Sequence, residues 1–545
     1  MPEIKLTNVT KRWGKFYAVE NLDLDIEDNS FITLLGPSGC GKTTTLRMIA
    51  GLETPTSGRI TIGDRVVFDS ELGINVPANK RKVGFLFQNY ALWPNMTVYD
   101  NIAFGLKNIK DELPNINFDA KRLGDIIRVL NDAGNVANLI NECRDKNGKI
   151  DENRAKMLII DNYTVSMATA KSVYGYKLQE SANPAETAEN IANGLKVKLN
   201  NLVEADKANG YELDFEYRRI KDGKIVTLKR KLSKEEIDLS VRRVSRIVKI
   251  GMFMDRYPAE LSGGQQQRVA IARTLAPEPT VLFMDEPLSN LDAKLRLEMR
   301  YELQRLHVET GSTFVYVTHD QMEAMTLATK ICLINNGVLQ QYEAPLTVYN
   351  TPANLFVADF VGNPSINFIE AKGSQNADGS IGLKIFDKYD VSFTATNGLN
   401  LSDWIKKRNK DAEDAANLHA QLLLDKKYVE KGNKDEVFKY NIVKIEDEFG
   451  VEEKEITDSD FVLGIRPEFI ETSDNARING EIYGVMPTGM ETTLKIRVDN
   501  FLLTSVKFGG DVYRIGTNIG ISFKGNGLML FDRKSGKLIA TGTLK

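Results

Sequence analysis

Gly36-Pro37-Ser38-Gly39-Cys40-Gly41-Lys42-Thr43 lies between an apolar run, residues 30–35, and a helix-type pattern, residues 44–50. A strand, a glycine-rich loop and a helix in this order predict a phosphate-binding P-loop. Glycines let backbone N–H groups converge on phosphate oxygens, and the helix that follows presents the positive end of its dipole. The segment therefore predicts an α/β fold that binds a nucleoside triphosphate.

Each polar side chain of this loop has an expected task. Lys42 neutralises the β- and γ-phosphates, and the Thr43 hydroxyl can ligate Mg²⁺. Thr44 begins the helix and is expected, like the loop, to lie against the nucleotide. Cys40 contributes its backbone rather than a nucleophilic thiol. ATP and Mg²⁺ are therefore the expected substrate and metal.

Two carboxylates follow a second apolar run, residues 281–284. Acids at the carboxyl end of a strand lie where an α/β sheet binds its ligands. Asp285 can hold the metal, and Glu286 can orient and polarise the attacking water. An isolated acidic pair would more often cap a surface strand, but a P-loop in the same chain favours catalysis. His319, after the apolar residues 313–317, is placed to sense the γ-phosphate.

The segment Leu261-Ser262-Gly263-Gly264-Gln265 resembles the signature of ABC ATPases. Ser262 and two glycines at the start of a helix form a second anion site with no catalytic base of its own. Such a half-site is useful when it closes over the γ-phosphate held by another subunit's P-loop. The resemblance therefore implies a homodimer, with residues 262–265 binding ATP across the interface.

Other segments resemble further elements of that family. Gln88 lies in a Q-loop-like segment and is implied to contact the metal and the water. Residues 289–292 resemble the D-loop, which adds Asp292 to the nucleotide site, and His319 matches the switch histidine. Trp13 occupies the place where the family stacks an aromatic ring on adenine.

Residues 285–307, 317–328 and 357–368 resemble the ATPases of maltose, multiple-sugar and glycerol-3-phosphate importers. Residues 464–468 resemble the all-β, OB-like regulatory domain of that subgroup. This resemblance implies two permease subunits, an extracytoplasmic solute-binding protein and a place on the cytoplasmic face of the membrane. A polyamine or other small-solute importer is the alternative. A soluble ABC ATPase of translation or DNA repair is disfavoured, because the chain has one cassette and its insertion lacks sustained heptads.

The chain has 545 residues, enough for several domains. We expect four segments: 1–110 and 234–360 form the ATPase, 111–233 is an inserted α+β subdomain, and 361–545 is the regulatory domain. The net charge of −3 gives no sign of a nucleic-acid partner. Three scattered cysteines indicate a reducing compartment.

The insertion is the main departure from the family. It enlarges the region between Leu106 and Leu261 to 154 residues. It is either a solvated extension or an added contact with the permease, the membrane or a regulator. A second departure is the enlarged, charged region of about 400–455.

Overall fold

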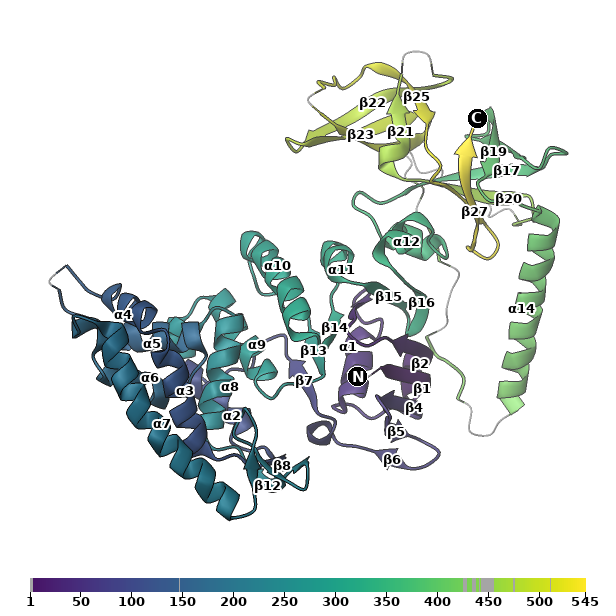
Figure 1. The fold of residues 1–545 in the computed structure, drawn as a ribbon. Coiled ribbons are helices and arrows are strands. Elements are labelled where there is room, and N and C mark those ends of the chain that lie inside the picture. The colour runs from purple at the N-terminus through teal and green to yellow at the C-terminus, as the bar shows by residue number, and fades with distance from the viewer. Residues whose placement is uncertain are drawn as a thin grey trace. The chain divides into compact units, whose positions relative to one another are not determined.

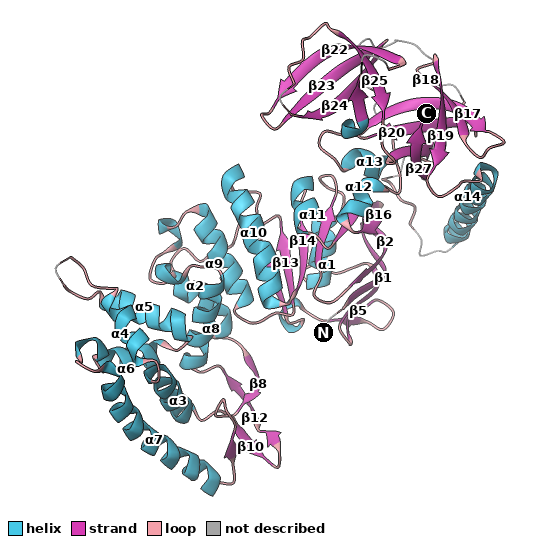
Figure 2. Cartoon of the chain, turned by 45° about the horizontal axis from the view of Figure 1, so that its top comes forward, coloured by secondary structure: helices cyan, strands magenta, loops and turns pink. Residues whose placement is uncertain are grey.

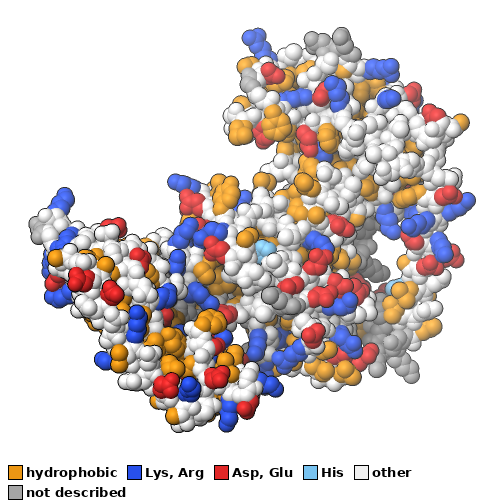
Figure 3. Space-filling model, viewed as in Figure 1, with side chains coloured by type: hydrophobic (Ala, Val, Ile, Leu, Met, Phe, Trp, Pro, Cys, Tyr) orange, Lys and Arg blue, Asp and Glu red, His pale blue; other side chains and the backbone are white. Residues whose placement is uncertain are grey.

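The computed structural model describes residues 3–146, 148–424, 429–433, 438–440, 442, 455–473, 476–509 and 511–545. The chain forms two compact units (Figure 1). Unit one contains residues 1–81 and 313–545, and unit two contains residues 82–312. On the face drawn in Figure 3, Lys and Arg side chains are interspersed with Asp and Glu. This mixed surface agrees with the small net charge.

The P-loop segment of unit one follows β3 (Phe31–Leu35) and precedes α1 (Lys42–Ala50). Strands run in the order β16-β15-β3-β14. Both β14 and β15 are parallel to β3, while β16 returns antiparallel to β15. Every residue of β3 and β14 is buried, as parallel strands covered on both faces require. The bounds are β14 Thr313–Val317, β15 Lys330–Asn335 and β16 Val338–Glu343.

A five-stranded antiparallel sheet, in the order β2-β1-β4-β5-β6, completes the ATPase part of unit one. Buried and exposed side chains alternate at the start of β1 and over the second half of β2, because one face of the sheet packs inward. The bounds are β1 Ile4–Trp13, β2 Phe16–Ile26, β4 Ser57–Ile62, β5 Arg65–Asp69 and β6 Ile74–Asn75. The helices that follow β14 and β16 are α11 Gln321–Leu327, α12 Pro345–Asn350 and α13 Leu355–Phe360.

Unit two pairs β7 (Val83–Leu86) in parallel with β13 (Val281–Asp285). Its other ATPase elements are helices, namely α2 Val98–Leu106, α8 Lys234–Ile247, α9 Gly263–Leu275 and α10 Ala293–Thr310. Helix α10 ends at Gly311, which adopts the left-handed conformation that glycine tolerates at helix ends.

The insertion in unit two is mainly helical and has a hydrophobic core of its own, made of residues between 126 and 195 (Figure 2). Its helices are α3 Phe118–Leu130, α4 Ala133–Asn141, α5 Glu152–Tyr163, α6 Met167–Gly175 and α7 Pro184–Ala208. Its strands are β8 Lys110–Pro114, β9 Glu212–Leu213, β10 Arg219–Lys221, β11 Lys224–Ile225 and β12 Thr227–Lys231. The segment thus contains both helices and strands.

Asp222 and Gly223 form the turn of a short hairpin, in which β10 and β11 pair only beside the turn. The next strand, β12, pairs with β8 instead of extending that hairpin. The contacts of Arg230 in β12 account for the pairing of β12 with β8. Its guanidinium donates to Pro114 O at 2.8 Å and to both carboxylate oxygens of Glu236 at 2.7 and 2.8 Å.

Among the residues of 361–545 that the structure describes, the elements are strands, the helix α14 (Leu401–Leu424) and a 3₁₀ turn at Pro467–Phe469, in agreement with the all-β domain that the sequence predicts. Six strands close a barrel in the order β17-β18-β19-β27-β26-β20. They are β17 Asn367–Gln375, β18 Ile381–Ile385, β19 Tyr389–Ala395, β20 Asp460–Ile465, β26 Leu528–Asp532 and β27 Leu538–Leu544. A five-stranded sheet joins it, made of β21 Ile470–Thr472, β22 Ile478–Pro487, β23 Glu491–Val498, β24 Phe501–Phe508 and β25 Asn518–Phe523.

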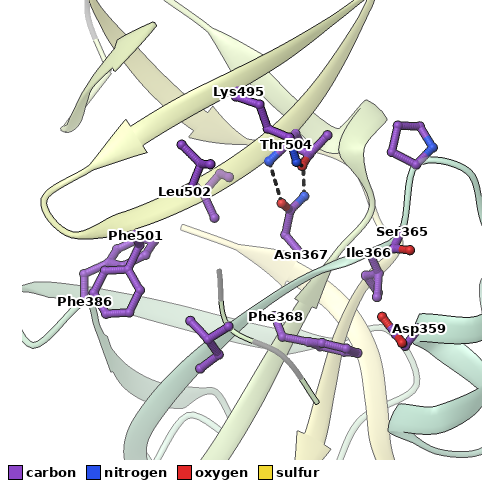
Figure 4. A pocket seen from close by; sticks show the side chains of 13 residues that line it. Asp359, Ser365, Ile366, Asn367, Phe368, Phe386, Lys495, Phe501, Leu502 and Thr504 are labelled. Carbon is purple, nitrogen blue, oxygen red and sulfur yellow. Dashed lines mark hydrogen bonds between the residues drawn. The ribbon is translucent and has the colours of Figure 1, made fainter. Parts of the chain in front are cut away.

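The barrel and this second sheet share one core and one polar link. Asn367 of β17 donates to Thr504 O at 2.8 Å and accepts from Thr504 N–H at 2.7 Å (Figure 4). Both groups are buried, so each bond satisfies an amide that would otherwise be costly to bury. The two sheets therefore form one domain.

Candidate nucleotide-binding site

Two neighbouring strands pack closely against the backbone of the P-loop, one at each end of the loop. A Cβ atom on Gly36 would lie 2.1 Å from Ile334 O of β15, and one on Gly41 would lie 2.1 Å from Ala18 O of β2. Gly41 also has a φ of 103°, in the left-handed region that favours glycine. The loop glycines are thus required by the neighbouring strands as well as by the phosphates.

Lys42 begins α1 and is 5% exposed. Its Nζ donates to Gly36 O and to Pro37 O, each at 2.7 Å. The ammonium group is therefore held inside the loop by carbonyl oxygens, which phosphate oxygens can replace. Burial raises the pKa of the Cys40 thiol above its ordinary value, although Lys42 opposes the shift. A neutral, buried thiol agrees with the expectation that Cys40 serves through its backbone.

His319 follows β14, the parallel neighbour of the strand that leads into the P-loop. Parallel neighbours end at the same edge of a sheet, so His319 and the P-loop share that edge. The segment before His319 is held by Glu323, whose Oε2 accepts from Thr318 Oγ1 and Tyr316 Oη at 2.7 Å each. Glu323 is 4% exposed. The sequence analysis missed Glu323, because an acid in the first turn of a helix is usually solvated.

Gln88, Glu286 and Ser289 come together in unit two. Gln88 Nε2 lies 3.4 Å from Glu286 Oε2 and 3.4 Å from Ser289 Oγ. Asn290 Nδ2 donates to Gln88 O at 3.0 Å. Glu286 has a φ of 45°, and such strain in a non-glycine residue persists where the surroundings impose it, often at functional sites. Asp285, one residue earlier, is buried at the end of β13.

The signature segment begins α9. Ser262 and Gly263 are exposed, and Ser262 N–H donates to Gln265 Oε1 at 2.9 Å. Gly264 is buried, and a Cβ there would lie 2.8 Å from the Leu295 side chain of α10. This glycine therefore permits close helix packing, while Ser262 and Gly263 remain open to solvent. Asp292 caps α10, accepting from Leu295 N–H at 2.9 Å.

Trp13 lies at the end of β1, opposite Phe16 in the β1–β2 hairpin. Its side chain is 51% exposed, its ring centroid is 6.5 Å from that of Phe16, and Lys11 Nζ lies 5.2 Å from the ring. A large aromatic surface is thus available for stacking.

The sequence is similar to those of known proteins. The family described as ABC transporter matches residues 19–289. The maltose/maltodextrin import ATP-binding protein MalK of Escherichia coli (strain K12) is 30% identical over 514 residues, which cover 94% of this chain and 90% of that protein. The chain belongs to the ABC transporter ATP-binding proteins.

Two further relatives of this ABC ATPase cover less of its length. The trehalose/maltose import ATP-binding protein MalK of Thermococcus litoralis is 37% identical over 371 residues, 68% of this chain and 67% of that protein. The spermidine/putrescine import ATP-binding protein PotA of Aster yellows witches'-broom phytoplasma is 37% identical over 365 residues, 67% of this chain and 74% of that protein. The dimeric structure of a bacterial ABC transporter cassette aligns with a TM-score of 0.35 at 23% identity, covering 63% of this chain and 98% of that one.

The oxygen ligands of this ABC ATPase fit Mg²⁺. Thr43 offers a hydroxyl, Gln88 an amide oxygen and Asp285 a buried carboxylate. Mg²⁺ in nucleotide sites takes a few such oxygens together with phosphates and water. Within the described part of the chain no three His, Cys, Asp or Glu side chains form a metal cluster. In their chemistry, the expected oxygen donors therefore fit Mg²⁺.

Proposed function

We propose that this ABC ATPase uses ATP hydrolysis to energise the import of a sugar or a glycerol-3-phosphate-like solute. The observation that carries the proposal is the sugar-import relative from E. coli, which aligns with 94% of the chain. The P-loop geometry supports it, since Lys42 and the loop backbone are arranged to receive phosphates. Segments resembling sugar-importer ATPases extend beyond the ATPase region.

The proposed roles follow the chemistry of each group. Lys42 and the backbone of residues 36–43 bind the phosphates, and Thr44 lies beside them. Glu286, held near Gln88, orients and activates water, while His319 donates to the γ-phosphate. When Mg²⁺ is bound, by Thr43, Gln88 and Asp285, it supplies charge neutralisation.

The signature residues Ser262, Gly263, Gly264 and Gln265, with Asp292, are proposed to complete the ATP site of a second copy. The open surface of Ser262 and Gly263 supports this role. A homodimer would then bind two ATP molecules and couple closure to two permease subunits at the cytoplasmic face of the membrane, with a solute-binding protein acting indirectly. Among the described residues, no helix has both the length and the apolar character needed to cross a bilayer.

Import of a polyamine is the second candidate. The relative from Aster yellows witches'-broom phytoplasma, named for spermidine/putrescine import, favours it. That relative aligns with 67% of the chain, against 94% for the E. coli sugar-import relative. Sugar import is therefore preferred.

The division at residues 110, 233 and 360 stays a prediction, as does a regulatory role for residues 361–545. The insertion at 111–233 is proposed to act outside the nucleotide site, because its core is built from its own residues.

Purification from the native cell tests the partners. The tagged chain would be extracted in mild detergent, and co-purifying proteins identified. Two multi-spanning permease subunits are expected, and solute-stimulated ATPase activity of that complex would identify the sugar or polyamine. Recovery with ribosomes or soluble enzymes and without a permease would overturn the proposal.

A further inference from the structure

Residues 429–433, which lie between α14 and β20 in the chain, contact the turn that joins β1 and β2. Gly432 N–H donates to Lys15 O at 2.8 Å. Asn433 Oδ1 accepts from Tyr17 N–H at 2.9 Å, and its Nδ2 donates to Tyr17 O at 3.0 Å. Tyr17 Oη donates to Val429 O at 2.8 Å. The C-terminal region thus bonds the backbone on both sides of Phe16.

Lys431 adds a charged contact to the same region. Its Nζ lies 2.7 Å from Glu20 Oε2 on β2 and 3.5 Å from Asn336 O, and its side chain is 10% exposed. The turn at Asn336 is hydrogen-bonded to the P-loop, because Gly337 N–H donates to Cys40 O at 3.0 Å. Gly337 O also accepts from Glu20 N–H at 2.9 Å. One lysine therefore contacts both β2 and the turn that braces the phosphate-binding loop.

The position of Trp13 depends on this hairpin. Trp13 pairs across the two strands with Phe16, and the backbone bonds to Lys15 and Tyr17 restrain Phe16 from both sides. A hairpin turn at the end of two strands is otherwise free to bend. Holding the backbone beside Phe16 restrains the end of the strand pair that carries Trp13 opposite it.

We propose that Lys431 and Asn433 are positioning residues for ATP, which hold the β1–β2 turn so that Trp13 presents its face to the adenine. This inference rests on the proposed base-stacking role of Trp13. It assigns residues 429–433, within the enlarged region of about 400–455, a task, namely to set nucleotide affinity from the C-terminal region.

The test compares a ligand that has a base with one that has none. ATP and inorganic tripolyphosphate would be titrated against the full chain and its Asn433→Ala and Lys431→Met variants. Both variants should bind ATP about 3–10-fold more weakly, which is part of the roughly 5–150-fold that stacking of one base is worth. Tripolyphosphate affinity should stay unchanged. In turnover assays KM for ATP should rise while kcat is kept. Asn479→Ala, on an exposed position of β22, is the matched control.

Exchanging the charges of Lys431 and Glu20 tests whether the contact between these two side chains supports ATP binding. Lys431→Glu and Glu20→Lys should each weaken ATP binding, and the double variant should recover most of the loss. Absence of recovery, or equal losses for ATP and tripolyphosphate, would overturn the inference. Trp13→Ala separates it from the proposed function. If this variant binds ATP normally, the stacking role fails; if it binds ATP weakly while Asn433→Ala is unaffected, only the positioning role fails.

Discussion

Replacing Gly41 with alanine should abolish productive ATP binding without removing any functional side chain. The added Cβ would lie 2.1 Å from Ala18 O, whereas ordinary contacts begin at 3.4 Å, so loop and strand must separate by about 1.3 Å. Gly39→Ala is the matched control. It also has a positive φ, 78°, but its Cβ would meet nothing within 4 Å.

The expected magnitudes separate the two variants. A left-handed alanine costs about 1–2 kcal/mol, so Gly39→Ala should weaken ATP binding by at most about 5–30-fold. Gly41→Ala carries the same backbone cost and also displaces the loop. Its ATP affinity should therefore be lower than that of Gly39→Ala. Because a misplacement of about 1 Å at a reacting site costs about 100-fold in rate, its turnover should also fall by at least about that factor.

Isothermal titration with ATP measures both affinities, and thermal unfolding without nucleotide checks that each variant folds. Folded Gly41→Ala protein that binds ATP as well as Gly39→Ala would refute the reasoning. It would mean that the contact between β2 and the P-loop does not govern the phosphate site.

Three further predictions concern catalysis, stability and the insertion. Glu286→Gln should keep ATP affinity but lower turnover at least about 100-fold, because water activation is lost; near-normal turnover in a phosphate-release assay would assign the role elsewhere. Arg408→Met should destabilise the C-terminal domain by about 3–5 kcal/mol in urea unfolding, since Asp532, 2.8 Å away and 2% exposed, loses its buried partner. Lys406→Met, whose side chain is 80% exposed, is the control, and equal losses would contradict the argument. Deleting residues 112–232 should leave ATP binding intact in a folded variant, and loss of binding there would show that the insertion supports the site.

Local patterns predicted the phosphate-binding part of the fold well. The apolar runs before Gly36 and before Glu286 correspond to β3 and β13, because fully buried parallel strands leave continuous apolar sequence. The turn at Asn336-Gly337 also follows a local pattern, since this dipeptide favours the backbone of a tight hairpin. The expected α/β class, with an all-β C-terminal domain, is confirmed.

Partners distant in sequence could not be predicted in this way. The pairing of β12 with β8 depends on Arg230 reaching Glu236 and Pro114 O, and no periodicity encodes such a choice. The buried Glu323 behind His319 is a similar case. Its two hydroxyl donors come from β14 and its end, and only the folded backbone brings them to one carboxylate.

The pairing of β8 with β12 also bears on how this protein could have acquired its insertion. Lys110 and Lys231 are cross-strand neighbours, so the excursion leaves and re-enters the host at nearly the same point. The entropy cost of closing a loop grows only slowly with its length, by about 0.6 kcal/mol for each doubling, so a long excursion between adjacent ends is tolerated. For the ATPase part of the chain, the whole insertion therefore takes the place of a long loop that joins two paired strands, β8 and β12. This junction is a natural site for grafting a foreign domain, such as a fluorescent reporter, or for exchanging the module between related transporters.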